Sequence, residues 1–129
     1  DNKENIKLGN TETRRDFTYV KDTCSAYIEV LKSEKMFGET INVGMNKSIS
    51  IIELFYLISK KLNFQSEVIT DDIRIRNIKS EVSNLVCNNS KLLEYTDWEP
   101  SHNFSDGLDS TIKWIKENKE YYNSDIYHV

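Results

Sequence analysis

The chain has 129 residues, and its 17 lysines and arginines are outnumbered by 21 aspartates and glutamates, which gives a net charge of −4. This length suits one domain, and the absence of a basic block argues against a general binder of nucleic acids or acidic membranes. No apolar run is long enough to span a bilayer, and the first residues, DNKEN, lack the pattern of a secretion signal, so we expect a soluble, cytoplasmic protein.

The first part of the chain predicts two short extended segments and then a helix. Residues 6–8 favour a strand that ends at a Gly-Asn turn, and residues 17–20 favour a second extended segment. Asp22 suits a helix N-cap because its carboxylate can accept hydrogen bonds from the amides of the first turn. Behind it, apolar side chains at helical spacing predict a core-facing stripe. The stripe consists of Cys24, Tyr27, Ile28 and Leu31.

The middle of the chain repeats this alternation of strand and helix. Residues 39–43 (ETINV), bounded by glycines, predict a buried strand. Ser50 and Glu53 form a capping box, in which each side chain can satisfy a backbone amide at the other residue. The helix behind this box extends to Asn63. Its apolar stripe consists of Ile51, Leu54, Phe55, Ile58 and Leu62.

The last part of the chain adds two extended segments and two helices. Residues 67–70 and 84–86 favour strands, Ser90 begins a short helix, and Ser105 caps a final helix. The order β-α-β-α-β followed by helices indicates an α/β or α+β fold. The chain has no GxGxxG, GxxxxGK[ST], HExxH or GxSxG motif, so it carries no cofactor signature of its own.

Two pairs of arginines are candidates for binding an anion. In an extended segment alternate residues share a face, so Arg15 lies with Phe17 while Arg14 lies with Asp16. An arginine beside an aromatic ring suits a nucleotide, whereas Arg14 and Asp16 read as a surface or structural pair. Arg74 and Arg76 can share a face in the same way, and the alternative is a solvated edge strand balanced by the neighbouring aspartates.

The remaining reactive side chains favour ordinary roles. His102 and His128 have no Ser or Cys partner in a recognised arrangement, and we interpret both as spectators, residues without a role in catalysis or binding. Cys24 and Cys87 are far apart and have no other ligand at metal-binding spacing. Reduced, part-buried thiols are the favoured interpretation of these cysteines, with a disulfide as the alternative. We expect the two tryptophans to be packing residues.

Several motifs in this order resemble a known enzyme family. They are LGNTETRRDFTYVKDT, GETINVG, SISIIEL, RIRNIKSEV and NNSKLLEYTDWEPSHNFSDGLDSTIKWIKEN. From about Ile6 to Tyr121 the chain resembles the carboxy-terminal part of extended short-chain dehydrogenases/reductases, the NAD-dependent epimerase/dehydratase family. The closest type is the sugar-nucleotide 4,6-dehydratases, such as those of legionaminic acid biosynthesis. The implied fold is α/β, a substrate-binding lobe of short strands and about four helices without the Rossmann cofactor core.

The resemblance implies roles for seven residues in substrate binding. The arginine of the RDF motif contacts the substrate diphosphate and falls on Arg15, with Phe17 beside it. A second diphosphate arginine matches Arg76, and Glu81 matches an acid near the ribose. The strand along the base corresponds to Ile6, Lys7 and Leu8. Asn77 stands where the family usually has proline, which frees the backbone next to Arg76.

The resemblance also implies what this chain does not contain. Residues 1–129 correspond to the substrate-binding region, with residues 122–129 expected as a flexible tail. In the parent enzyme, NAD is bound by residues outside this chain and takes a hydride from C4 of the sugar, and water is then lost through a 4-keto intermediate. We therefore expect this chain alone to be inactive, with no catalytic or metal-binding residues.

The expected partners are a UDP- or GDP-linked hexose or N-acetylhexosamine and the missing amino-terminal Rossmann region, in a parent that forms a homodimer. No nucleic acid or membrane partner is expected. Two alternatives remain open: a portion of a nucleotide-sugar 4-epimerase, or a stand-alone binding module without catalysis.

Overall fold

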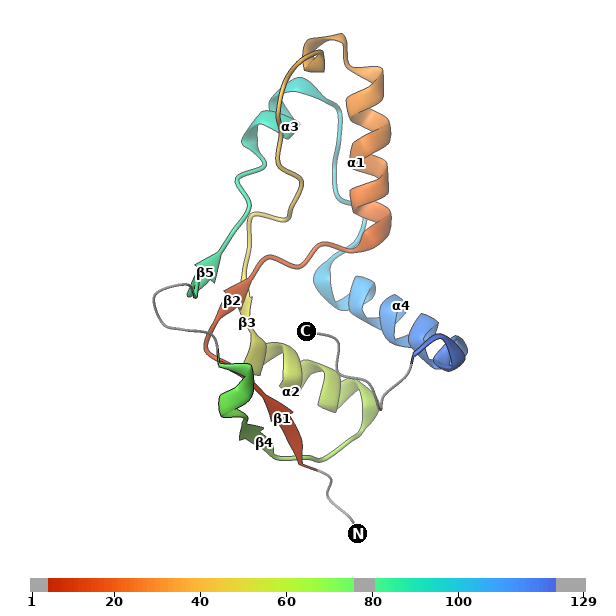
Figure 1. Cartoon of the computed structure of the whole chain (residues 1–129). Helices are drawn as coiled ribbons and strands as arrows, with labels where there is room; N and C mark the ends of the chain where they lie inside the picture. Colours follow the sequence, from red (N-terminus) through yellow and green to blue (C-terminus); the bar gives the residue numbers. More distant parts are fainter. Residues whose placement is uncertain (1–4, 76–80, 123–129) are drawn as a thin grey trace.

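The computed structural model describes residues 5–75 and 81–122, an elongated arrangement of four α-helices with short strands and 3-10 turns (Figure 1). The strands are β1 (Ile6–Leu8), β2 (Arg14–Arg15), β3 (Ile49–Ser50), β4 (Val68–Thr70) and β5 (Asn84–Leu85). The helices are α1 (Val20–Lys32), α2 (Ile51–Leu62), α3 (Ser90–Tyr95) and α4 (Phe104–Glu117). The 3-10 turns are Glu34–Met36, Asp72–Arg74 and Lys119–Tyr121. Arg76 and residues 123–129 of the predicted tail at 122–129 lie outside the described residues.

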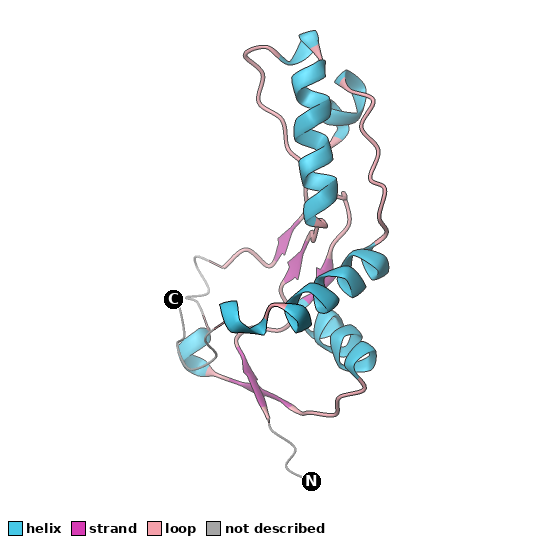
Figure 2. Cartoon of the chain, turned by 90° about the vertical axis from the view of Figure 1, so that its right-hand side faces the viewer, coloured by secondary structure: helices cyan, strands magenta, loops and turns pink. Residues whose placement is uncertain are grey.

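The strands form two small sheets at different levels of the long axis (Figure 2). In one sheet, β1 runs parallel to β4, with Ile6 opposite Val68. In the other, β2 lies between β3, which is antiparallel to it, and β5, which is parallel. The predicted strands at residues 6–8, 67–70 and 84–86 are confirmed to within one residue.

The main core lies between α1 and the segment that follows α3. Ala26 and Leu92 are fully buried, and Trp98 is 2% exposed. The indole Nε1 of Trp98 donates to the backbone carbonyl of Asp22 and to Ser25 Oγ, so the buried ring has no unsatisfied donor. Trp114, by contrast, is half exposed, so only one of the two tryptophans belongs to this core.

Helices α2 and α4 are each capped locally and are joined to one another by a lysine. Ser50 and Glu53 form the predicted capping box at the start of α2. α4 begins at Phe104 with Asn103 as its N-cap, so the predicted cap at Ser105 is wrong. Instead, Ser105 accepts a hydrogen bond from Lys61 Nζ, which also pairs with Asp109 at 2.8 Å and so joins α2 to α4. No helix among residues 5–75 and 81–122 is long and apolar enough to cross a membrane.

The start of α1 differs from the sequence prediction. The helix begins at Val20 with Tyr19 as its N-cap, so residues 17–20 do not form a strand and Asp22 does not cap the helix. The amides of Asp22 and Thr23 donate to the carbonyl of Tyr19, so the helix is capped three residues earlier than predicted. The side chain of Asp22 is therefore available for a more distant partner.

The outer surface of α1 also contradicts the prediction. All four residues of the predicted stripe are exposed: Cys24, Tyr27, Ile28 and Leu31. Residues 39–43 do not form a strand, although Ile41 and Val43 pack against the core. A strand needs a partner for its backbone hydrogen bonds, and no described strand pairs with this segment.

Candidate functional site

The two arginines of strand β2 bind different partners. Arg14 Nη1 lies 3.1 Å from Glu53 Oε2, and Arg14 Nη2 donates to the carbonyl of Ser48. The predicted pair between Arg14 and Asp16 is therefore wrong. Asp16 lies just beyond β2, and its carboxylate accepts instead from two backbone amides. Arg14 is thus a structural residue that ties β2 to the start of α2.

Arg15 lies on the opposite face and lines a cavity of about 420 Å³. Its Nη1 donates to the carbonyls of Arg14 and Val82, at 2.7 Å and 2.9 Å. These two hydrogen bonds hold the guanidinium between β2 and the residues that precede β5. Its Nε and Nη2 atoms donate to no acceptor within the described residues. Phe17 lines the same cavity, as the alternation of the sequence predicted. The other lining residues are Met45, Lys47, Ile49, Pro100, Ser101, His102, Asn103 and Phe104.

Asp16 fixes the loop that carries Lys47 to this cavity. Its two carboxylate oxygens accept from the amides of Met45 and Cys87, at 3.0 Å and 3.1 Å. Asn46, the residue after Met45 in this loop, has a left-handed backbone conformation with φ 56°. Asparagine tolerates this conformation better than most residues. Two cations, Arg15 and Lys47, therefore line the same cavity from separate segments. Burial and the charge of Asp16 raise the pKa of the Cys87 thiol, so the thiol stays protonated.

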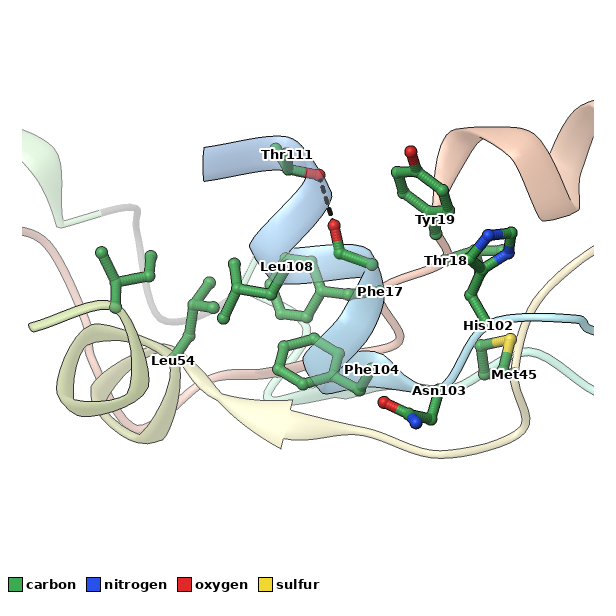
Figure 3. A pocket seen from close by; sticks show the side chains of 12 residues that line it. Phe17, Thr18, Tyr19, Met45, Leu54, His102, Asn103, Phe104, Leu108 and Thr111 are labelled. Atoms are coloured by element: carbon green, nitrogen blue, oxygen red, sulfur yellow. Dashed lines mark hydrogen bonds between the residues drawn. The ribbon is translucent and has the colours of Figure 1, made fainter. Parts of the chain in front are cut away.

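A second cavity of about 340 Å³ adjoins the first and is mostly apolar (Figure 3). It lies between α2, α4 and residues 17–19. Gly107 permits this close approach, because a Cβ there would lie 2.9 Å from the Cβ of Tyr19. The two cavities share Phe17, Met45, His102, Asn103 and Phe104.

A buried carboxylate lies beside these cavities. Asp22 is fully buried, and its Oδ1 accepts from the backbone amide and hydroxyl of Ser101 and lies 2.9 Å from His102 Nδ1. Burial acts to raise the pKa of Asp22, but the hydrogen bonds from His102 and Ser101 outweigh it and lower the pKa below its usual value. Ser101 Oγ lies 3.0 Å from the same Nδ1, so serine and aspartate share one ring nitrogen. A catalytic triad needs them on opposite nitrogens, which excludes that role.

Sequence reasoning missed this cluster. His102 was expected to be a spectator, and Asp22 was expected to cap its own helix. The two residues are separated by 80 positions, so no local pattern links them.

The other predicted site residues lie away from the Arg15 cavity. Ile6, Lys7 and Leu8 form β1, in the two-stranded sheet. Glu81 Oε2 accepts a hydrogen bond of 2.7 Å from Asn10 Nδ2, just after β1, so the structure brings Glu81 to the end of this strand. Arg76 lies outside the described residues.

With this geometry, the chain can be compared with known proteins. The family model described as GDP-mannose 4,6 dehydratase matches residues 1–111. The chain belongs to the NAD-dependent epimerase/dehydratase family. Similar members of this family include a putative UDP-glucose 4-epimerase from Methanocaldococcus jannaschii, 30% identical over 117 residues, which cover 91% of this chain and 36% of that protein. A dTDP-D-glucose 4,6-dehydratase from Bos taurus is 30% identical over 113 residues, covering 81% of this chain and 30% of that protein.

Solved structures of the epimerase/dehydratase family agree with the fold. An epimerase from Methanothermobacter thermautotrophicus has a TM-score of 0.81 at 25% identity, covering 93% of this chain and 35% of that one. A dTDP-glucose 4,6-dehydratase from Bacillus anthracis in complex with NAD has a TM-score of 0.75 at 29% identity, covering 92% of this chain and 37% of that one. The chain is thus α/β and matches only part of these Rossmann-type enzymes, and NAD is a cofactor of the family.

A dinucleotide pyrophosphate usually binds at a helix N-terminus that follows a glycine-rich turn. No such turn precedes a helix among the described residues of this family member, and the first turns of α1, α2 and α4 carry Asp22, Glu53 and Asp106, whose charges disfavour a phosphate at those positions. Among the described residues there is also no cluster of three or more His, Cys, Asp or Glu side chains that could hold a metal ion.

Proposed function

We propose that this chain is the nucleotide-sugar-binding portion of an NAD-dependent sugar-nucleotide 4,6-dehydratase, a lyase that removes water from a nucleotide-linked hexose. Arg15 carries the proposal, because its guanidinium is fixed in a cavity beside Phe17 and retains donors that no described acceptor uses. Guanidinium groups bind phosphate oxygens through paired N–H donors, and an adjacent ring can pack against a sugar or base. The proposed ligand of Arg15 is the substrate diphosphate.

The remaining predicted residues complete the proposed binding mode. Ile6, Lys7 and Leu8 lie along the base, Glu81 lies near the ribose, and Arg76 is a second ligand of the diphosphate. The hydrogen bond between Glu81 and Asn10 supports this arrangement, because it keeps the carboxylate at the end of the strand assigned to the base. Binding energy from these non-reacting parts of the substrate positions the sugar, while the chemistry belongs to residues outside this chain.

The proposal also assigns a role to the exposed surface of α1. Tyr27 is 62% exposed and Leu31 is 85% exposed, and beside this helix the amides of residues 40–43 donate to no acceptor within the described part of the chain. An apolar face next to unpaired extended backbone is typical of a surface that another segment covers. We propose that this segment belongs to the amino-terminal Rossmann region of a cytoplasmic, homodimeric enzyme.

A 4-epimerase is the second candidate, and the similarity to the putative UDP-glucose 4-epimerase of M. jannaschii favours it. Both reactions use the same kind of substrate, so the binding residues alone do not separate them. Incubation of the full-length protein with NAD and each nucleotide sugar separates them by product: a dehydratase gives a 4-keto-6-deoxy sugar, and an epimerase gives an isomer of unchanged mass. A stand-alone binding module would bind the sugar nucleotide and give neither product.

The binding proposal is tested by calorimetric titration of the full-length protein with UDP-glucose, GDP-mannose and dTDP-glucose. For the nucleotide that binds, Arg15→Ala should weaken the affinity about tenfold or more, since a hydrogen bond to a charged group contributes about 1.5–3 kcal/mol. Arg14→Ala is the matched control, because Arg14 is the adjacent residue but pairs with Glu53 on the other face. Unchanged affinity in Arg15→Ala would remove Arg15 from the site.

A further inference from the structure

His102 lies where it can meet a ligand of the Arg15 cavity. It lines both adjoining cavities, together with Phe17 and Met45. Figure 3 shows these three side chains in the apolar cavity. The histidine side chain is 29% exposed, and its ring packs edge-on against Tyr19 with the centroids 4.7 Å apart. These contacts restrict the orientation of the imidazole at the boundary of the two cavities.

Hydrogen bonds determine which nitrogen of His102 is available. The Asp22 carboxylate can only accept, and Ser101 Oγ already donates to it at 2.9 Å. Nδ1 therefore carries a proton that points to Asp22 Oδ1 and Ser101 Oγ. The second ring nitrogen, Nε2, has no hydrogen-bond partner within residues 5–75 and 81–122. When the ring is protonated, Nε2 becomes a charged donor for a ligand.

We propose that His102, oriented by Asp22, is a further donor to the anionic diphosphate bound by Arg15 in the cavity that Lys47 also lines, and that its protonation is coupled to substrate binding. The inference rests on the proposed function. Four groups act on the imidazole charge: Asp22 on α1 favours it, Arg15 on β2 and Lys47 on the neighbouring loop oppose it, and Tyr19 contributes a neutral ring. The remaining described residues that line the Arg15 cavity are uncharged.

The coupling follows from these opposing charges. Without ligand, two cations oppose a third positive charge at the same cavity. A bound diphosphate neutralises them and adds an acceptor, so binding and protonation of His102 favour each other. Affinity for the sugar nucleotide should therefore fall as the pH rises through the range where imidazoles lose their charge, about pH 5.5 to 8. The diphosphate of a nucleotide sugar has no proton that titrates in this range, so the ligand itself does not produce the effect.

The experiment is a calorimetric titration of the full-length protein with UDP-glucose, GDP-mannose and dTDP-glucose at about pH 5.5 and pH 8, in pairs of buffers with different ionisation enthalpies. The wild type should bind more tightly at the lower pH, by about tenfold or more, and take up protons on binding, which corresponds to one hydrogen bond to a charged group. His102→Asn keeps an amide donor that can reach Asp22 but lacks the distal nitrogen. It should lose the pH dependence and the proton uptake while unfolding at nearly the wild-type temperature.

The outcomes separate the two proposals. If Arg15→Ala weakens binding but His102→Asn keeps the wild-type pH profile and proton uptake, the role of His102 is wrong and the binding site stands. If Arg15→Ala leaves the affinity unchanged, Arg15 is not a ligand of the diphosphate, and both the proposed binding mode and the role of His102 fail. If His102→Asn unfolds, His102→Gln provides the second test, because it offers an uncharged donor at the distal position. Persistent proton uptake in that variant would also overturn the inference.

Discussion

Helices α1 and α2 both carry apolar stripes, yet among the described residues only the stripe of α2 packs against other parts of the chain. In α2, Phe55 is buried and Leu54 and Ile58 line the apolar cavity facing α4. In α1 the stripe faces outward, and the buried positions are Asp22 and Ala26. Helical periodicity identifies an amphipathic helix, but it does not say whether the covering partner is in the same chain. The exposed stripe of α1 is therefore the surface that we propose another segment covers.

The largest expected effect tests this contrast directly. Phe55→Ala in α2 should lower the free energy of unfolding by about 3–5 kcal/mol, because it removes a buried aromatic ring and leaves a cavity. Leu31→Ala in α1 is the matched substitution and should change stability by about 0.5 kcal/mol or less, because Leu31 is 85% exposed. Urea unfolding of this chain measures both values. Equal losses would mean that the outer face of α1 is covered in the folded chain.

A smaller effect concerns the polar face of α1. Asp22→Asn should destabilise the chain by about 1.5–3 kcal/mol near neutral pH, because it removes the charged acceptor shared by Ser101 and His102. The folded state lowers the pKa of Asp22, so its contribution is present above the unfolded pKa and is lost as the pH falls through the folded pKa.

The difference in stability between wild type and Asp22→Asn should accordingly shrink in acid. Urea unfolding at a series of pH values measures it. A difference that stays constant between neutral and strongly acidic pH would show that the charge of Asp22 contributes nothing.

The smallest effect concerns how each helix begins. Ser50 caps α2 through the amide of Glu53, whereas Tyr19 at the start of α1 makes no side-chain cap. Ser50→Ala should cost about 1 kcal/mol in the free energy of unfolding, while Ser50→Thr keeps the hydroxyl and should retain most of it. Thermal unfolding followed by circular dichroism compares the two variants. Equal losses would contradict a role for the hydroxyl.

The features that the sequence predicted correctly depend on interactions between residues close together in the chain. The capping box at Ser50 and Glu53 links residues three positions apart, and the separation of Arg15 from Arg14 follows from alternation along an extended segment. Both were readable from the chain because their geometry is set by the backbone. The helix α2 was predicted for the same reason, since its stripe and its cap agree.

The contacts that the sequence did not predict join residues that are far apart in the chain. Arg14 pairs with Glu53 rather than Asp16, and Asp22 meets His102 across 80 positions. Residues 39–43 have the composition of a buried strand, but pairing requires a neighbour that the described residues do not provide. The residue pattern gives the secondary structure that a segment prefers, and tertiary contacts decide whether the segment adopts it.

The strand pairings also set the order in which this chain can assemble. β1 pairs with β4 and β2 pairs with β5, so in each parallel pair the first strand is made long before its partner. Closing such long loops is slow compared with forming the helices between them. During synthesis α1 and α2 can therefore form while β2 still lacks β5. The carbonyl of Val82 that holds the Arg15 guanidinium belongs to that later segment, so Arg15 cannot make this hydrogen bond until the segment has joined β2.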